Sequence, residues 1–361
     1  MSRPTADGVR CMLMRGGTSK GLFFLAGDLP AEPADRDALL LAIMGSGHPL
    51  QVDGVGGAHP LASKVAVVSR SEREDADVDY LFLQLGVEQA TITDRQNCGN
   101  ILAGVGPFAV ERGLIDAGSP TTTTRVLMVN SGSVVTAAFA TPGGVPAYAG
   151  GTEIAGVPGS AAPVLLRFAG TAGSATGSLL PTGRVRDVVD GVEVTCVDNG
   201  MPVVVARAGD LGIGGYEAPD ELAADGELTA RVQSLRIAAG KLMGLGDVSG
   251  LSVPKTTLVS SPRDGGTICT RTFIPVRPHT AIGVLGAVSV ATALLLDGAA
   301  GAGLAAIKPG QTRFDIEHPA GHLEVEAEVD QASRPPRVVR SGVVRTARKL
   351  FDGTVFPRRS R

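Results

Sequence analysis

Short apolar runs dominate the first quarter of the chain, and such runs are typical of β-strands. Residues 9–14 and 22–25 flank a glycine-containing segment, residues 15–21, so we expect a hairpin with a long loop. Residues 63–69 and 78–85 are two more short apolar runs that predict buried strands. The pattern therefore favours a protein built largely from strands.

Helical spacing of apolar residues predicts three helices. Residues 33–44 have an amphipathic repeat, whereas residues 101–113 and 281–296 are apolar and rich in small side chains. We expect four glycines to let a curved sheet close around these two apolar helices: Gly104, Gly106, Gly283 and Gly286. The run at 281–296 is too short to span a bilayer of about 30 Å, so it predicts a buried core helix.

The two apolar helices lie about half the chain apart, and each follows a short polar segment. This arrangement indicates an internal duplication and an α/β (α+β) fold with two pseudo-symmetric domains. Each domain is expected to wrap a curved mixed sheet around its central helix. We set the N-terminal domain at 1–184 and the C-terminal domain at 185–343, with 344–361 crossing back to the first. The active site is expected in the cleft between the domains.

Composition narrows the function classes. The 361 residues include 33 Lys and Arg against 36 Asp and Glu, so the formal net charge is −3. Aromatic residues make up only 4%. A near-neutral chain with few stacking platforms is a poor candidate for nucleic-acid binding. We expect neither a nucleic-acid nor a membrane partner. Basic residues after Arg334 interleave with apolar ones and predict strand faces with a frayed end.

The four cysteines lie far apart, and none has the spacing of a zinc site. We expect reduced thiols in a cytoplasmic protein that holds no metal. Cys98 stands out because it directly precedes an apolar helix, whose N-terminus favours a thiolate or a bound carboxylate. Gly99 would let a ligand approach the backbone, and Asn97 and Asn100 flank the pair. An ordinary helix cap or an inert buried thiol is the alternative.

Lys64 opens an apolar strand after a glycine loop at residues 54–57. A lysine at such a place can lose part of its hydration, which lowers its pKa and makes a neutral amine available as a base. The alternative is a lysine whose stem lies along the strand while its charge stays in water.

Several other segments suggest anion binding. The loop with Arg15, Gly17, Thr18 and Ser19 lacks the spacing of a phosphate loop, but its amides and hydroxyls suit a carboxylate. In the second half we name five further candidates, each in a turn or near the second apolar helix: Asn199, Met201, Arg271, His279 and Thr280. A plain turn is the alternative at Asn199.

These segments together resemble the methylaconitate isomerase and 4-oxalomesaconate tautomerase family, which has the diaminopimelate-epimerase-like fold. The resemblance covers nearly the whole chain and rests on eight motifs: residues 14–21, 63–66, 97–100, 105–109, 193–202, 253–255, 283–293 and 344–348.

The resemblance implies that Lys64 is the proton-abstracting base and that Cys98 is an acid or a proton relay. It implies a small polycarboxylate substrate and no cofactor, and it leaves a homodimer open. Relatives that invert amino acids use two facing cysteines, but residues 279–283 contain none. We therefore disfavour an amino-acid racemase.

The expected function is an isomerase that interconverts tautomers of 4-oxalomesaconate by a keto–enol or allylic proton shift, in gallate-type aromatic catabolism. One alternative is a 2-methylaconitate cis–trans (allylic) isomerase. A second is a non-catalytic protein that binds tricarboxylates with the same fold.

Overall fold

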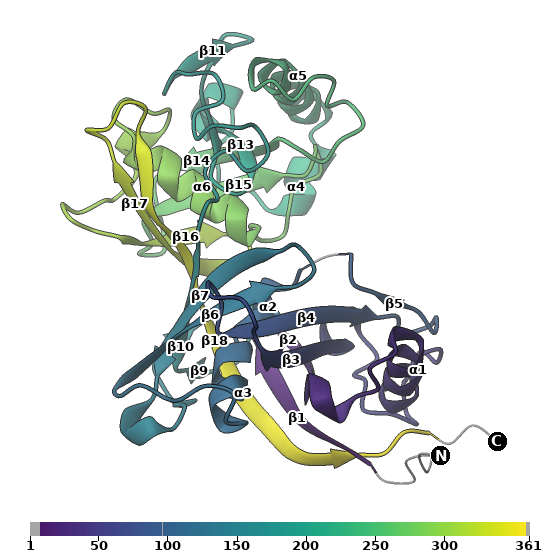
Figure 1. Ribbon diagram of the computed structural model, residues 1–361. Helices are drawn as coiled ribbons and strands as arrows, with labels where there is room; N and C mark the ends of the chain where they lie inside the picture. The colour runs from purple at the N-terminus through teal and green to yellow at the C-terminus, as the bar shows by residue number, and fades with distance from the viewer. Residues whose placement is uncertain (1–7, 96, 359–361) are drawn as a thin grey trace. The chain divides into compact units, whose positions relative to one another are not determined.

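The computed structural model describes residues 8–95 and 97–358 (Figure 1). The chain divides into two compact units. Unit 1 contains Met1–Leu166 and Arg345–Arg361, and unit 2 contains Arg167–Val344.

Unit 1 is built on a sheet whose first and last strands pair. The order is β1-β2-β3-β4-β6-β7-β10-β18, and β18 pairs with β1 from Val9↔Val355 to Gly16↔Ala347 (Figure 1). The sheet therefore closes on itself, and this closure leaves neither β1 nor β18 as an open edge there. The strands are β1 (Val9–Gly16), β2 (Ser19–Leu25), β3 (Lys64–Arg70), β4 (Val78–Leu85), β6 (Thr121–Met128), β7 (Ser133–Ala140), β10 (Pro163–Phe168) and β18 (Arg337–Val355).

Two sets of helices pack against this sheet. On one face, α1 (Pro33–Met44) buries Leu40, Ile43 and Met44 in a cluster with residues of β2, β3 and β4. On the other, α2 (Gly99–Leu102) contacts β1 and β2, and α3 (Val105–Glu111) contacts β3, β6 and β7. The sequence therefore predicted α1 and β4 with their correct bounds. It also predicted the β1–β2 hairpin, but the loop is shorter than expected.

The expected single helix at 101–113 is two helices, and Pro107 explains the break. Proline has no N–H to donate to the carbonyl four residues earlier, and its ring clashes with that carbonyl. The residue four positions before Pro107 is Ala103, which directly follows α2 and is its C-cap. The small elements of unit 1 are β5 (Ile92–Thr93), β8 (Thr152–Glu153), β9 (Ser160–Ala161), η1 (Ala26–Asp28), η2 (Pro60–Ala62) and η3 (Pro142–Gly144).

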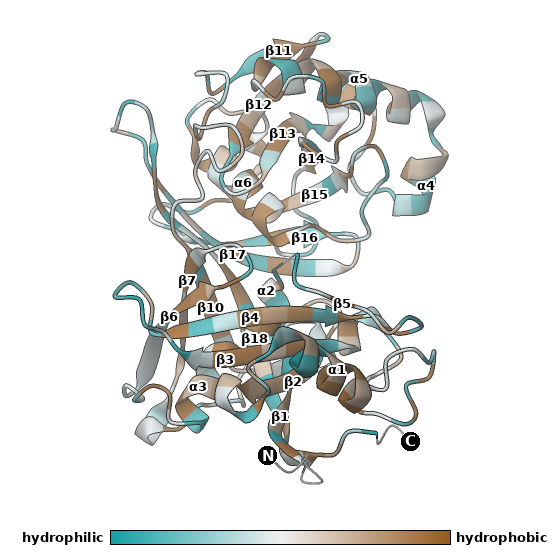
Figure 2. Cartoon of the chain, turned by 45° about the vertical axis from the view of Figure 1, so that its right-hand side comes forward, coloured by the Kyte–Doolittle hydropathy of each residue, from teal (hydrophilic) through white to brown (hydrophobic). Residues whose placement is uncertain are grey.

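Unit 2 wraps an open sheet around α6 (Val284–Leu295). The strand order is β18-β17-β16-β15-β14-β13-β12-β11, and α6 contacts β12, β13, β16 and β17. Hydrophobic residues recur along α6 and these strands (Figure 2), in agreement with the core helix expected there. The strands are β11 (Asp187–Val189), β12 (Val192–Asp198), β13 (Pro202–Arg207), β14 (Lys255–Ser260), β15 (Ile268–Phe273), β16 (Arg313–His318) and β17 (Gly321–Asp330).

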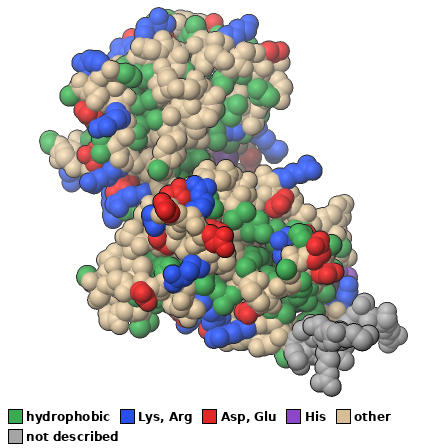
Figure 3. Space-filling model, in the orientation of Figure 1, with side chains coloured by type: hydrophobic (Ala, Val, Ile, Leu, Met, Phe, Trp, Pro, Cys, Tyr) green, Lys and Arg blue, Asp and Glu red, His purple; other side chains and the backbone are tan. Residues whose placement is uncertain are grey.

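A second hydrophobic cluster joins α5 (Gly226–Leu242) to the other face of this sheet through Val232, Leu235 and Ala239. Lys/Arg and Asp/Glu side chains are interspersed on the visible face of each unit rather than gathered by sign (Figure 3). Across the described residues, no helix is long and apolar enough to cross a membrane. The remaining elements are α4 (Pro219–Ala224), η4 (Ala208–Leu211) and η5 (Ala302–Leu304).

Strand pairing confirms the internal duplication. In unit 1 the successive pairs β1–β2, β2–β3, β3–β4, β4–β6 and β6–β7 are antiparallel, parallel, antiparallel, parallel and antiparallel. In unit 2 the pairs β12–β13, β13–β14, β14–β15, β15–β16 and β16–β17 follow the same sequence. Lys64 and Lys255 each begin the third strand of this pattern.

The unit boundary falls between residues 166 and 167, whereas the sequence analysis set it at 184. Residues 167–184 belong to unit 2, and hydrogen bonds connect this segment to strand β12. The amides of Ala175 and Thr176 donate to Asp198 Oδ2 at 2.8 and 2.9 Å. At the other end, Arg345–Arg361 returns to unit 1, and the basic C-terminal stretch lies largely in β18.

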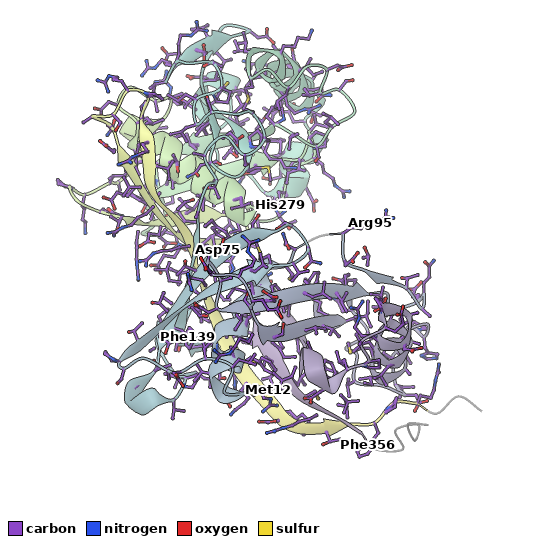
Figure 4. All side chains as sticks on the ribbon, in the orientation of Figure 1. Met12, Asp75, Arg95, Phe139, His279 and Phe356 are labelled. Carbon is purple, nitrogen blue, oxygen red and sulfur yellow. The ribbon has the colours of Figure 1, made fainter. Side chains whose placement is uncertain are left out.

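The four helix glycines differ from what we expected. A Cβ on Gly104 would lie 2.8 Å from the Phe23 ring, and one on Gly106 would lie 2.5 Å from the Phe139 ring. These two permit close packing. Phe139 is labelled in Figure 4. At Gly283 and Gly286 a Cβ would meet no described atom within 4 Å, apart from its chain neighbours and the helix's own backbone. The close approach is therefore a property of unit 1 alone.

This difference predicts opposite effects of the same substitution. Gly106→Ala forces the buried Phe139 ring to move, and we expect it to lower the free energy of unfolding by about 1–3 kcal/mol. Gly286→Ala meets open space in a helix and should raise that free energy by up to about 1 kcal/mol. Urea unfolding of both variants measures the two values. Equal effects at the two positions would contradict the packing described here.

Candidate active site

Lys64 is a buried amine on the face of the unit 1 sheet opposite to α1, since its neighbours Val65 and Val67 pack in the α1 cluster. It pairs with Gly21 on β2 and with Gln84 on β4, and its side chain is 7% exposed. Its Nζ donates a hydrogen bond to Gln84 Oε1 and lies 5.2 Å from the centre of the Phe82 ring. Burial lowers the pKa of Lys64 below its ordinary value, and the negative charge of a Cys98 thiolate nearby partly offsets this effect. The strand thus provides an amine that can lose its proton.

Gln84 fixes the direction of this hydrogen bond, and the sequence analysis did not name it. Its Nε2 donates to the carbonyls of Pro60, Ser63 and Leu85 at 3.2, 3.1 and 3.2 Å. With the amide nitrogen engaged, the amide oxygen faces Lys64. The available signal was a polar residue inside the apolar run at 78–85.

Cys98 lies just before α2, with its side chain partly exposed. Its carbonyl accepts hydrogen bonds from the Leu102 amide at 3.0 Å and from the Tyr80 hydroxyl at 3.3 Å. Burial raises the pKa of Tyr80, and the charge of a Cys98 thiolate raises it further. The structure thus brings Lys64 and Cys98 within electrostatic range of each other on one face of unit 1.

The residues around Cys98 are more open. Asn97 is exposed, and a Cβ on Gly99 would meet no described atom within 4 Å beyond its chain neighbours and its own helix. There is therefore space beside Gly99, and the approach of a ligand to its backbone stays a prediction.

The loop between β1 and β2 packs on the start of α2. Asn100 Nδ2 donates to Thr18 Oγ1 at 3.0 Å, and the Gly17 amide donates to Thr346 O at 2.8 Å. Gly17 has φ +51°, and a Cβ there would lie 2.2 Å from Asn100 Oδ1. Only glycine fits this position without moving Asn100.

Arg15 was expected to bind a substrate carboxylate, and that role stays a prediction; its position in the sheet differs from that of Lys64. Arg15 pairs with Lys20, whereas Lys64 pairs with the next residue, Gly21. Because side chains of adjacent residues in a strand point to opposite faces, Arg15 lies on the other face of the sheet from Lys64. Its Nη1 donates to Gly17 O at 2.8 Å and to Thr346 O and Oγ1 at 3.1 and 2.9 Å. Arg15 therefore stabilises the β1–β2 loop from the face of the sheet opposite to Lys64.

Ser19 and Arg345 lie on the Lys64 face instead. Ser19 precedes Gly21 by two residues, and Arg345 precedes Ala347, the partner of Gly16, by two residues. Arg345 Nε donates to Asn100 Oδ1 at 3.2 Å, and burial lowers the pKa of Arg345 to about 10. Arg345 was not among the expected site residues, although it lies in the last of the motifs that carried the resemblance.

Two of the unit 2 candidates serve the fold. Asn199 is completely buried, its Nδ2 donates to Thr292 Oγ1 at 2.8 Å, and its Oδ1 accepts from Thr171 Oγ1 at 2.5 Å. Buried Arg271 donates from Nε to Glu217 O at 2.7 Å and from Nη1 to Thr270 O at 2.9 Å. These hydrogen bonds hold both side chains within unit 2. The expected role of both residues in substrate binding stays a prediction.

The other unit 2 candidates lie near α6. Met201 O accepts from Ser289 Oγ at 2.8 Å, and Thr280 is exposed. His279 (Figure 4) is half-buried, and its Nδ1 accepts from the Ala281 amide at 2.8 Å. Burial and the positive charge of Lys255 lower the pKa of His279, which favours the neutral ring.

Lys255 is the unit 2 equivalent of Lys64, and the sequence analysis did not give it a role. It is half-buried at the start of β14, and burial and the charge of Arg236 lower its pKa. In the described part of the chain, no group of three or more His, Cys, Asp or Glu side chains could hold a metal ion.

Two topologically equivalent units, each with a mixed sheet around apolar helices and a lysine that opens the third strand, define a protein of the diaminopimelate-epimerase-like fold class. The family model described as PrpF protein matches residues 7–358. The chain belongs to the PrpF protein family.

Curated relatives and a solved structure agree with this assignment. The (4E)-oxalomesaconate Delta-isomerase of Novosphingobium sp. strain KA1 is 57% identical, with 97% of this chain and 98% of the relative covered. The 4-oxalomesaconate tautomerase of Pseudomonas putida is 53% identical, with coverage of 96% and 95%. The crystal structure of a methylitaconate-delta-isomerase has a TM-score of 0.88 at 31% identity and covers 97% of this chain and 95% of that one.

Burial of Lys64 predicts a pH-dependent penalty on stability. Because its pKa is lower in the folded than in the unfolded protein, the unfolded state binds more protons between the two values, and stability there rises with pH. The penalty is complete below the folded pKa and vanishes above the unfolded value of about 10.4. Lys64→Met removes the charge, so we expect it to raise the melting temperature at pH 7 and to have a smaller effect near pH 10.

Thermal unfolding at both pH values measures this gap. Lys308→Met is the matched control, since Lys308 is exposed and the same change there should leave the melting temperature almost unaltered. A destabilised Lys64→Met protein at pH 7 would argue against a buried, penalised amine.

Proposed function

We propose that this protein is an isomerase that moves a proton along a conjugated oxo-polycarboxylate, with 4-oxalomesaconate as its substrate. The observation that carries the proposal is the Lys64 amine, buried and oriented by Gln84 within electrostatic range of the Cys98 thiol. The names of the two most similar relatives described above support the substrate. Their identity of 53% or more extends over nearly the whole chain.

The reaction needs one base that removes a proton from the substrate and one acid that returns a proton to it. Neutral Lys64 removes a carbon-bound or enolic proton, and the negative charge that remains spreads over the conjugated carbonyl as a dienolate. The Lys64 ammonium stabilises that charge at close range. The Cys98 thiol then donates a proton to a different atom of the substrate, and the resulting thiolate recovers a proton from Lys64. No net proton, electron or cofactor is consumed.

We propose a small polycarboxylate as the only partner that this chemistry requires. The near-neutral charge and the interspersed surface charges give no support to a nucleic-acid partner. All four cysteines are free thiols, which supports the cytoplasmic setting expected from the sequence.

An allylic isomerase of a methyl-substituted substrate is the second candidate. The 0.88 TM-score to a methylitaconate-delta-isomerase favours it. Either reaction can use Lys64 and Cys98 in the same roles, so substrate comparison must separate the two.

The test is proton exchange in heavy water, followed by NMR with 4-oxalomesaconate, 2-methylaconitate and 3-methylitaconate. We expect deuterium incorporation and isomerisation with 4-oxalomesaconate. Lys64→Met should lower kcat by on the order of 10²–10⁴ because it removes the base, and Cys98→Ala should lower kcat without abolishing substrate binding. Lys308→Met is the control for loss of a lysine charge.

Turnover of a methyl-substituted substrate alone would replace the proposal with the second candidate. Tight binding of all three compounds with no deuterium incorporation would identify a non-catalytic binding protein. Near-wild-type turnover by Lys64→Met would overturn the role of Lys64.

A further inference from the structure

A buried polar cluster continues from Lys64 along the same face of the unit 1 sheet. Strand register places Ser19 two residues before Gly21, the partner of Lys64, and side chains two residues apart in a strand share a face. Ser19 is opposite Gly16, and Gly16 pairs with Ala347, which is two residues from Arg345. The side chains of Ser19 and Arg345 therefore lie on the same face of the sheet as Lys64.

Ser19 carries a hydroxyl that the described part of the chain leaves unsatisfied. The residue is 2% exposed, and its Oγ has no hydrogen-bond partner among the described residues. Buried hydroxyls are almost always paired, because burial without a partner has a free-energy penalty. A ligand oxygen at this point would remove that penalty.

Arg345 brings a positive charge to the same face of the sheet. Its residue is 8% exposed, and its Nε donates to Asn100 Oδ1. Asn100 Nδ2 in turn donates to Thr18 Oγ1, so the amide is held with its oxygen toward Arg345. A planar guanidinium with a fixed orientation matches the geometry of a carboxylate.

We infer that Ser19 and Arg345 form a subsite that binds one carboxylate of the substrate and directs the reacting atoms toward Lys64. This inference rests on the proposed function, since it assumes that a polycarboxylate is bound on this face. It assigns the carboxylate-binding role in unit 1 to Arg345 in place of Arg15, which points to the opposite face.

Steady-state kinetics on 4-oxalomesaconate test the subsite. Arg345→Gln should raise KM on the order of tenfold or more, with a smaller change in kcat. Ser19→Ala should raise KM several-fold and leave the melting temperature equal to or above that of the wild type, because it deletes an unsatisfied hydroxyl. A merely structural role for Ser19 would leave KM unchanged. Arg348→Gln is the matched control, since Arg348 is exposed on the same strand.

A half-ester of the substrate sharpens the result. The wild type should prefer the full polycarboxylate to the half-ester that lacks the recognised carboxylate, and Arg345→Gln should lose this preference. If Arg345→Gln does not fold, Arg345→Lys and Ser19→Ala provide the test. Folded variants with wild-type KM and wild-type preference would overturn the inference.

Binding to Lys64→Met separates this inference from the proposed function. If the wild type shows no turnover, but Lys64→Met binds 4-oxalomesaconate in calorimetry and the added Arg345→Gln change weakens that binding, the subsite stands and the function fails. If the wild type turns over while Arg345 and Ser19 affect neither KM nor binding, the function stands and the subsite fails.

Discussion

The candidate site depends on one constraint, which is that an amine must remain buried at the start of a strand. Lys64 can be buried because β3 pairs on both sides, with Gly21 on β2 and Gln84 on β4. A Cβ on Gly21 would lie 2.5 Å from the Lys64 carbonyl oxygen, so a glycine is needed beside it. The Gln84 side chain then accepts a hydrogen bond from the Lys64 amine without adding a charge. A carboxylate at that position would favour the ammonium form and raise the pKa of the base.

The sequence contains most of the fold, since its elements are set by local patterns. The amphipathic repeat at 33–44 and the apolar run at 78–85 predict α1 and β4 because period and burial agree there. The duplication could be inferred from two apolar helices half a chain apart, and strand pairing confirms it. The break between α2 and α3 was also available in the sequence, since Pro107 sits inside the apolar pattern. The return of the C-terminal segment to the first domain was expected, but its pairing with β1 was not, because that pairing joins segments more than 330 residues apart.

The motifs of the candidate site could be predicted from the sequence, but the face of the sheet on which each side chain lies could not. In a strand, a shift of one residue sends a side chain to the other face. Arg15 and Ser19 lie in one short loop motif, yet only Ser19 shares a face with Lys64. The hydrogen bonds of Asn199 and Arg271 are likewise not visible in the sequence. Both side chains could donate hydrogen bonds to a carboxylate, but in unit 2 they donate to neighbouring segments of the chain. Sequence shows what a side chain can bind, whereas packing decides whether it is available.

The duplication also explains why the two units need not do the same chemistry. Both begin their third strand with a lysine whose pKa is lowered by burial, so the topology itself creates this environment. The residues that precede the apolar helices have diverged. Unit 1 places a thiol there, at Cys98, while unit 2 places His279, whose Nδ1 is engaged by the Ala281 amide. Inversion of a stereocentre by opposed thiols needs an acid and a base of the same kind in both halves. A proton shift along one conjugated substrate needs only one base and one acid, and the proposed function assigns these roles to Lys64 and Cys98 of unit 1.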